Sequence, residues 1–288
     1  MSDPLKSPFP YFGGKRKIAA AVWQRFGKVA NFVEPFFGSG AVLLSRPDEP
    51  GIETVNDLDG FVSNFWRALK SKPELVAEHA DWPVLENDLH ARHAWLVGQK
   101  ESMQARLEGD PEWFDAKVAG WWVWGMACWI GGGFCSGKGP WQVQEVDGVR
   151  QLVHLGDAGQ GVKRQLVHLG NAGRGVNRKL VHLGGYAPKG VNAHNDLQDY
   201  FQALADRLKR VRVCCGDWSR VCGPTVTSKH GLTGVFLDPP YADTANRDSN
   251  IYRIDSESVA HDVREWAIEN DTNPLMRIAL CGYDGDIV

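Results

Sequence analysis

The first part of the chain alternates between short apolar runs and segments in which apolar residues recur with helical spacing. The expected elements are, in order, a helix over 15–25, a strand over 31–34, a helix over 41–44, a strand over 52–55 and a helix over 60–69. Alternation of strands and helices is typical of a parallel, doubly wound α/β sheet.

The same pattern returns near the end of the chain. It predicts a helix over 195–210, strands over 211–215 and 234–237, a helix over 256–270 and a strand over 276–281. Between these halves the periodicity changes. We therefore expect one α/β domain formed by residues 1–71 and 195–288, interrupted by an insertion at 72–194 that forms a second lobe.

The insertion contains an internal repeat. The sequence Leu-Val-His-Leu-Gly recurs every 14 residues within 151–192 and predicts stacked short strands or hairpins. The repeated histidines are His154, His168 and His182. Duplication explains their spacing, and no carboxylate or cysteine keeps step with them, so we expect no metal site.

Composition places the chain among ordinary globular proteins, with 43% apolar residues, 23% charged residues and a net charge of −3. No apolar run approaches the roughly 20 residues needed to cross a bilayer. The first residues lack the layout of a secretory signal. The six scattered cysteines show no CxxC spacing, so we expect reduced core thiols in a cytosolic protein.

Charge is unevenly distributed along the chain. Residues 150–192 carry seven basic side chains and one acidic side chain, Asp157. A basic strip on a slightly acidic body suits a protein that contacts nucleic acid with one face.

The sequence Asp238-Pro239-Pro240-Tyr241 follows an apolar strand and carries the strongest chemical signal. Two prolines fix the backbone and remove two N–H donors, which leaves the Pro239 carbonyl free to face a cleft. The acid and this carbonyl are two acceptors, as an aromatic amine with two N–H groups requires, and holding both hydrogens frees the nitrogen lone pair to attack a sulfonium methyl group. Tyr241 offers a ring on which an extruded base can stack.

Two further motifs follow the first two strands. Glu34-Pro35-Phe36-Phe37-Gly38-Ser39-Gly40 is a strand end with a Gly-x-Gly turn, where backbone amides can approach a bound cofactor. Asp57 follows the next strand, where an acid can bond ribose hydroxyl groups, and Asp59 is expected to cap the next helix.

Two weaker motifs complete the set. Tyr11-Phe12-Gly13-Gly14-Lys15 precedes the first helix and could bind a carboxylate. Gly216-Asp217-Trp218 places an acid beside an aromatic ring after a strand, which suits an adenine ring and its amino group.

Together and in this order, the five motifs resemble the Dam-like adenine-specific DNA methyltransferases. The resemblance implies a Rossmann-like, S-adenosylmethionine-dependent methyltransferase fold with an inserted target-recognition lobe. It further implies direct methyl transfer to the N6 amino group of an adenine flipped out of duplex DNA, without a metal. We expect a monomer that binds double-stranded DNA in the cytoplasm of a bacterial or phage-infected cell. We expect no binding to a membrane.

The resemblance also implies roles for individual residues. Tyr11 and Lys15 would contact the methionine part of the cofactor, the 38–40 loop would lie beneath it, Asp57 would hold the ribose, and Asp217 and Trp218 the adenine. The catalytic residues would be Asp238, Pro239, Pro240 and Tyr241. The cofactor-binding residues would be Tyr11, Gly14, Lys15, Glu34, Phe36, Gly38, Gly40, Asp57, Asp217, Trp218 and Asp238.

The insertion is longer than in shorter members of the family. A tryptophan-rich segment over 121–129 is interpreted as a core helix, and the following loop over 131–138 is an alternative DNA-facing element. The residues expected to contact DNA are Lys138, Arg164, Arg174 and Arg178. A solvated basic hairpin array is an equal alternative for the repeat region.

Three alternatives remain open from the sequence. The acceptor could be RNA adenine or a glutamine amide, although Asp rather than Asn at position 238 argues against the amide. The chain could be a catalytically idle DNA-binding relative. The family's sheet normally continues past residues 277–283, so we expect its last strands to be missing here, where the sequence ends at Val288.

Overall fold

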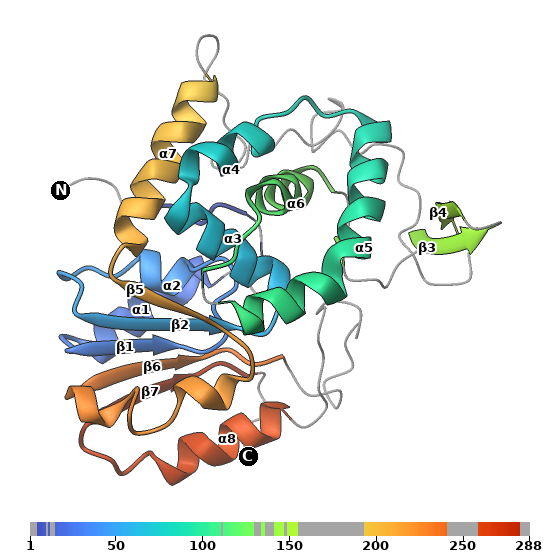
Figure 1. Cartoon of the computed structure of the whole chain (residues 1–288). Helices are drawn as coiled ribbons and strands as arrows, with labels where there is room; N and C mark the ends of the chain where they lie inside the picture. The colour runs from blue at the N-terminus through green and yellow to red at the C-terminus, as the bar shows by residue number, and fades with distance from the viewer. Residues whose placement is uncertain are drawn as a thin grey trace.

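The computed structural model describes residues 5–9, 11, 15–110, 112–129, 134–135, 141–146, 149–154, 193–240 and 259–282. Its centre is a five-stranded sheet in which every neighbouring pair of strands is parallel (Figure 1). The strand order is β5 (Val211–Cys215), β2 (Ile52–Asp57), β1 (Asn31–Glu34), β6 (Thr233–Leu237) and β7 (Met276–Leu280). The predicted parallel α/β sheet is thereby confirmed.

The two faces of the sheet bury separate groups of side chains, because successive residues of a strand point to opposite faces. Phe32 and Phe236 belong to one buried cluster, and Val33 and Val235 belong to the other. The first cluster is covered by α1 (Arg16–Phe26), α2 (Ala41–Leu44), α3 (Gly60–Ser71) and α7 (Ala193–Leu208). The second is covered by η2 (Trp218–Val221) and α8 (Val259–Glu269), and α8 lies on the side of the sheet away from α3 and α7 (Figure 1). A further short helix, η3 (Ser228–His230), precedes β6.

In its described residues before α7, the segment predicted as an insertion contains three helices and a hairpin. They are α4 (Pro73–Ala80), α5 (Glu86–Gly109), α6 (Ala116–Cys128), β3 (Trp141–Val146) and β4 (Val149–His154). Asp115 caps the start of helix α6, because its side chain accepts a hydrogen bond from the Val118 N–H. The helix buries Trp122 and Trp124. It packs on α3 and α4, so the interpretation of the tryptophan-rich segment as a core helix is confirmed.

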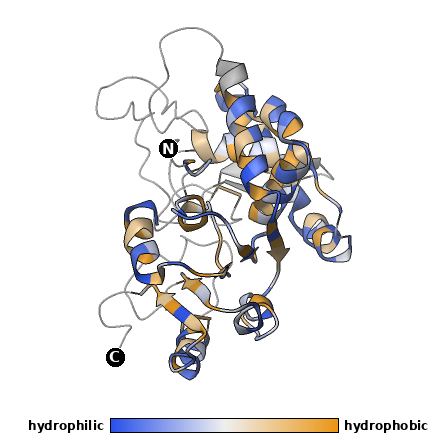
Figure 2. Ribbon diagram, turned by 90° about the vertical axis from the view of Figure 1, so that its left-hand side faces the viewer, coloured by the Kyte–Doolittle hydropathy of each residue, from blue (hydrophilic) through white to orange (hydrophobic). Residues whose placement is uncertain are grey.

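The buried cluster on the α3 side of the sheet includes residues on both sides of position 72, where the insertion was predicted to begin. It includes Phe65 of α3, Val76 of α4, Trp122 of α6 and Phe201 of α7. Figure 2 shows hydrophobic residues along the central strands and on the helices stacked beside them. The α4 and α6 helices therefore extend the core of the α/β domain rather than packing only on each other.

Most predicted elements agree with the structure to within two residues. β2 is the clearest correction, because it continues to Asp57 instead of ending at Val55. Asn56 and Asp57 are polar and look like a strand end in the sequence, but they remain paired with Cys214 and Cys215 of β5. Other boundaries shift by one or two residues: α1 begins at Arg16, α3 ends at Ser71, α7 spans Ala193–Leu208, β6 begins at Thr233 and β7 ends at Leu280.

The first of the three sequence repeats forms a strand, as predicted. Residues 151–154 belong to β4, which pairs antiparallel with β3 rather than with another described repeat. The second and third repeats, including His168 and His182, lie outside the described residues. All six cysteines are free thiols. Within the described part of the chain, no helix has both the length and the apolar character needed to span a bilayer.

Candidate cofactor and amine-binding pocket

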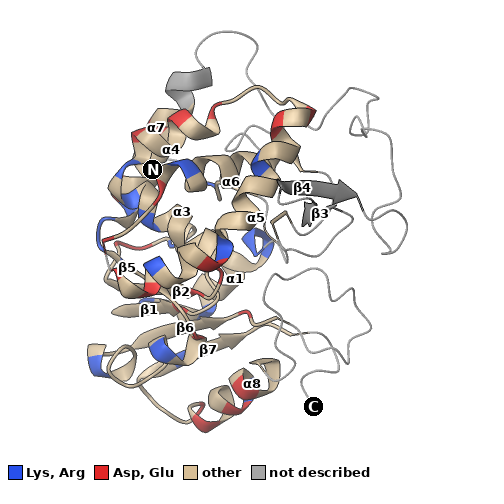
Figure 3. Ribbon diagram, turned by 45° about the vertical axis from the view of Figure 1, so that its right-hand side comes forward, with Lys and Arg blue, Asp and Glu red and all other residues tan. Residues whose placement is uncertain are grey.

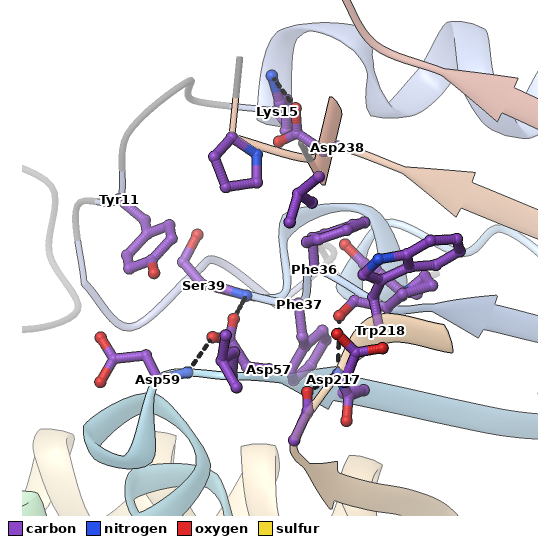
Figure 4. A pocket seen from close by; sticks show the side chains of 18 of the residues that line it. Tyr11, Lys15, Phe36, Phe37, Ser39, Asp57, Asp59, Asp217, Trp218 and Asp238 are labelled. Atoms are coloured by element: carbon purple, nitrogen blue, oxygen red, sulfur yellow. Dashed lines mark hydrogen bonds and ion pairs between the residues drawn. The ribbon is translucent and has the colours of Figure 1, made fainter. Parts of the chain in front are cut away.

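A pocket lies at the carboxyl ends of the strands, where the strand order reverses around β1. β1 is followed in sequence by β2 on one side, whereas β6 lies on its other side. Open α/β sheets bind their ligands at such a point. The residues lining the pocket, many of them drawn in Figure 4, are Tyr11, Lys15, Glu34, Pro35, Phe36, Phe37, Gly38, Ser39, Ala41, Asn56, Asp57, Leu58, Asp59, Gly216, Asp217, Trp218, Asp238, Pro240 and Val259.

The glycine turn after β1 forms the floor of this pocket. Gly38 has a φ of +48°, and a Cβ atom there would lie 2.5 Å from Cδ1 of Tyr11. Only glycine fits this backbone conformation and this close approach without strain. The Gly38 N–H donates to the Asp57 carboxylate at 2.8 Å, and the Gly40 N–H donates to the Phe37 carbonyl at 2.9 Å. These two amides therefore hold the turn in shape.

Asn56 joins the three loops that surround the pocket. Its side chain is buried, and its amide donates to the Pro35 carbonyl at 3.1 Å and to the Gly216 carbonyl at 2.9 Å. The ends of β1, β2 and β5 are thereby fixed relative to one another. Asn56 was not predicted as a site residue, because its partners come from segments distant in sequence.

Two of the lining acids also cap helices. Asp59 accepts a hydrogen bond from the Phe61 N–H at 3.0 Å, so its predicted capping role at α3 is confirmed. Asp217 caps η2 by accepting from the Ser219 N–H at 2.9 Å. Asp57 differs from both, because its two carboxylate oxygens accept from the Gly38 and Asp59 amides of two different loops.

Asp238 and Lys15 form an ion pair at the other end of the pocket (Figure 4). The Lys15 Nζ atom lies 2.8 Å from Oδ1 of Asp238, and the two side chains are 13% and 11% exposed. Burial raises the pKa of the Asp238 carboxyl above its ordinary value, whereas the charge and hydrogen bond of Lys15 act in the opposite direction. Lys15 thus favours the carboxylate form of a buried acid.

Glu34 lies at the end of β1, and its Oε2 atom has no hydrogen-bond partner within the described residues. Burial raises the pKa of its carboxyl well above the ordinary value, and the neighbouring carboxyls of Asp238, Asp57 and Glu53 raise it further. A hydrogen bond from the Leu43 backbone partly opposes this effect. A buried acid with an unpartnered oxygen is suited to receive a cationic or hydrogen-bond-donating ligand group.

Aromatic side chains form one wall of the pocket. Phe36 follows β1, and its ring lies 6.4 Å from that of Trp218, with an angle of 27° between the planes. Trp218 also contacts Trp266 of α8 edge to face, with 6.3 Å between ring centroids. This wall offers a flat apolar surface beside Asp217, the combination that a nucleobase can use.

The structure brings together most residues that the sequence predicted for the site. Tyr11, Lys15, Glu34, Phe36, Gly38, Asp57, Asp217, Trp218, Asp238 and Pro240 all line the pocket. Gly40 lies in the same turn and Pro239 in the same segment as Asp238, but neither is among the lining residues. Gly14, Tyr241, Lys138, Arg164, Arg174 and Arg178 lie outside the described residues.

The pocket also contains residues that the sequence analysis missed. Leu58 follows Asp57 and is 39% exposed, and Val259 comes from the start of α8. Val259 follows a long segment with no chemical motif, so nothing in the sequence placed it near β1. In the described part of the chain, no group of three or more metal-ligating side chains is found.

Sequence comparison agrees with this arrangement of residues. None of the curated proteins matches the chain. Residues 11–91 match the family model described as D12 class N6 adenine-specific DNA methyltransferase. The matched range contains Tyr11, Lys15, the glycine turn and Asp57, and it ends before the segment that contains Asp238. The predicted resemblance is thus confirmed over residues 11–91, the part of the chain that is similar to the D12 class N6 adenine-specific DNA methyltransferases.

Proposed function

We propose that the protein transfers a methyl group from S-adenosylmethionine to the N6 amino group of adenine in duplex DNA. The match to adenine-specific DNA methyltransferases supports adenine methylation of DNA in general. The observation that carries the finer proposal is the position of Asp238, which shares one pocket with the glycine turn at Gly38. A cofactor and an acceptor amine bound there would be neighbours.

The charge of the pocket fits this cofactor. Five carboxyl side chains and one ammonium group are among the lining residues. S-adenosylmethionine carries a sulfonium and an ammonium charge against one carboxylate, so an acidic pocket favours its binding. The unpartnered Oε2 of Glu34 is a fitting acceptor for the cofactor's ammonium group, and the glycine at position 38 lets the Tyr11 ring lie directly against the turn.

Each wall of the pocket is suited to one part of the cofactor. Asp57 and the adjacent loop would bind the ribose hydroxyl groups, and Phe36, Asp217 and Trp218 would bind the adenine. Tyr11 and Lys15 would lie at the methionine part. When bound, the cofactor supplies an electrophilic methyl group on its sulfonium.

Asp238 and Pro239 would hold the acceptor amine. The Asp238 carboxylate can accept one N–H of the adenine amino group, and the Pro239 carbonyl can accept the other. Holding both hydrogens concentrates the nitrogen lone pair on the side of the methyl donor. The proton that the amine loses after methyl transfer would pass toward Asp238 or to solvent. The base reaches such a pocket only when it is extruded from the duplex, with Tyr241 as its stacking partner.

We also propose which parts of the chain contact DNA. Residues 72–194 would form the target-recognition part between the halves 1–71 and 195–288, and Lys138, Arg164, Arg174 and Arg178 would meet phosphates. Figure 3 shows Lys and Arg interspersed with Asp and Glu over the described helices, with several acids on α8. The DNA-binding face is therefore proposed on the side of the insertion, in a monomer that acts in the cytoplasm.

The decisive test is methylation-sensitive sequencing of DNA from cells that express the chain. Modified adenines at a defined sequence are expected. A labelled-methyl competition between duplex DNA and RNA separates the two acceptors, and preference for RNA would contradict the proposal. Failure to bind S-adenosylmethionine at tens of micromolar would instead indicate an idle DNA-binding protein.

Gly38→Ala is expected to weaken cofactor binding by roughly 5- to 30-fold. The positive φ alone costs a non-glycine residue about 1–2 kcal/mol, and the new methyl group would displace the Tyr11 ring. Isothermal titration with S-adenosylmethionine measures the change. Gly223→Ala is the matched control, because a Cβ at Gly223 meets no atom within 4 Å. Equal affinities of the two variants would contradict this assignment of the glycine turn.

A further inference from the structure

Lys15 occupies a position that the sequence did not predict. The family resemblance assigns it to the cofactor's methionine part, whereas the structure pairs its ammonium group with Asp238 at 2.8 Å. Lys15 is the residue that precedes α1, and Asp238 directly follows β6. The pair therefore joins the N-terminal segment to the proposed amine-binding site.

The ion pair is centred on one oxygen of the carboxylate. Lys15 contacts Oδ1 at 2.8 Å, which makes Oδ2 the candidate acceptor for a bound amine. An ammonium group fixed on one oxygen restricts rotation of the carboxylate and leaves the second oxygen as an oriented acceptor. Because both side chains are nearly buried, the attraction between them is screened less than on the surface.

Within the described residues, the other titratable groups that interact with Asp238 do not supply a second cation. Glu34 lies on β1, and Cys281 directly follows β7. Burial raises the pKa of the Cys281 thiol to about 11, with Asp238 contributing in the same direction, so the thiol is neutral at physiological pH. The pocket residue contributed by α8 is Val259, which is uncharged. Among these neighbours, only Lys15 favours ionisation of Asp238.

We propose that Lys15 is a positioning residue for Asp238, holding carboxylate oxygen Oδ1 in an ion pair so that Oδ2 can accept a hydrogen bond from the target amine. This inference rests on the proposed function. It predicts that loss of the ammonium group impairs the chemical step through Asp238, in addition to any effect on the cofactor.

The pH dependence of the reaction separates these two effects. The proposed role of Asp238 uses its carboxylate form, which is a stronger acceptor than the neutral acid, so kcat rises with pH through the pKa of this carboxyl. Without Lys15, burial acts unopposed and raises that pKa further. The acidic limb of the profile must therefore move to higher pH.

The experiment compares Lys15→Met and Lys15→Arg with the wild-type chain, at saturating DNA and S-adenosylmethionine. We expect Lys15→Met to shift the acidic limb of kcat upward by about one pH unit or more, equivalent to a tenfold change in proton concentration. Lys15→Arg keeps the positive charge, so the acidic limb of its kcat profile should lie within a few tenths of a pH unit of the wild-type limb. If Lys15→Met raises the KM for the cofactor but does not move the acidic limb of kcat, the inference is overturned. Lys15 would then contribute only to cofactor binding.

A second measurement does not depend on activity. The carboxyl carbon of Asp238, observed by NMR in the cofactor-free protein, should titrate at higher pH in Lys15→Met than in the wild-type chain. An unchanged titration overturns the inference even if the protein methylates DNA. If the wild-type chain methylates no DNA while this titration shifts, the proposed function fails and the control of Asp238 by Lys15 stands.

Discussion

Alanine at position 238 is expected to lower the rate of methyl transfer by about 100-fold or more, the size of effect seen when one preorganised hydrogen-bonding group is removed from an active site. The carboxylate is the acceptor that the proposed mechanism requires, and it is 11% exposed in a pocket where solvent cannot readily replace it. Cofactor binding should be partly retained, because the residues proposed to bind the ribose and adenine are unchanged. Single-turnover methylation of duplex DNA measures the rate, and titration with cofactor measures the affinity.

Two further variants test whether the loss of activity is specific to the Asp238 carboxylate. Asp238→Asn keeps one acceptor oxygen and should retain more activity than Asp238→Ala. Asp271→Ala removes an exposed acid from the turn before β7 and should leave the rate unchanged. Wild-type activity in Asp238→Ala would remove this residue from the mechanism.

The sheet was predictable because its strands are short apolar runs bounded by turn residues. β1, α2 and β5 have the predicted boundaries. β2 was predicted too short, since its last two residues are polar and remain paired in the sheet. Polar residues such as Asn56 and Asp57 stay in a strand when the neighbouring strand still pairs with them. The sequence alone does not show where the neighbouring strand ends.

Helix α5 illustrates why the insertion was harder to predict. Its apolar residues do not form a clear stripe, and it buries Arg92 and His93. The Arg92 guanidinium lies within 5 Å of the ring centroids of Trp82, Trp121 and Trp124, at 4.8, 4.8 and 4.5 Å. A buried cation surrounded by rings satisfies the packing, but it interrupts the hydrophobic pattern from which helices are recognised.

The site could be predicted as far as it depends on motifs at strand ends. Carboxyl ends of parallel strands meet at one edge, so the acids that follow β2, β5 and β6 had to lie close together. The pairing of Lys15 with Asp238 and the hydrogen bonds of Asn56 could not be predicted, because they depend on which loops meet above the sheet.

A buried ionic network links strand β2 to helix α7, which is distant in the sequence. The Glu53 side chain is fully buried on β2 and accepts from Arg46 at 3.0 Å and from Arg207 of α7 at 2.6 and 2.8 Å. The Arg46 side chain is 3% exposed and also lies over the Trp23 ring. Arg207 belongs to α7, which follows the segment predicted as an insertion. The network thus holds α7 against β2, a strand that lies far earlier in the sequence.

Glu53→Ala is expected to destabilise the protein by about 3–5 kcal/mol, because removing one partner of a buried ion pair leaves an uncompensated buried charge. Here Arg46 would lose its carboxylate partner and has little access to water. Such a loss is a large part of the total stability of a domain, about 5–15 kcal/mol. Urea titration followed by circular dichroism measures the change. Asp206→Ala breaks the exposed pair with Lys209 and is the matched control, which should remain close to wild type. An unfolding midpoint of Glu53→Ala equal to that of this control would show that the network does not stabilise the packing of α7 on the sheet.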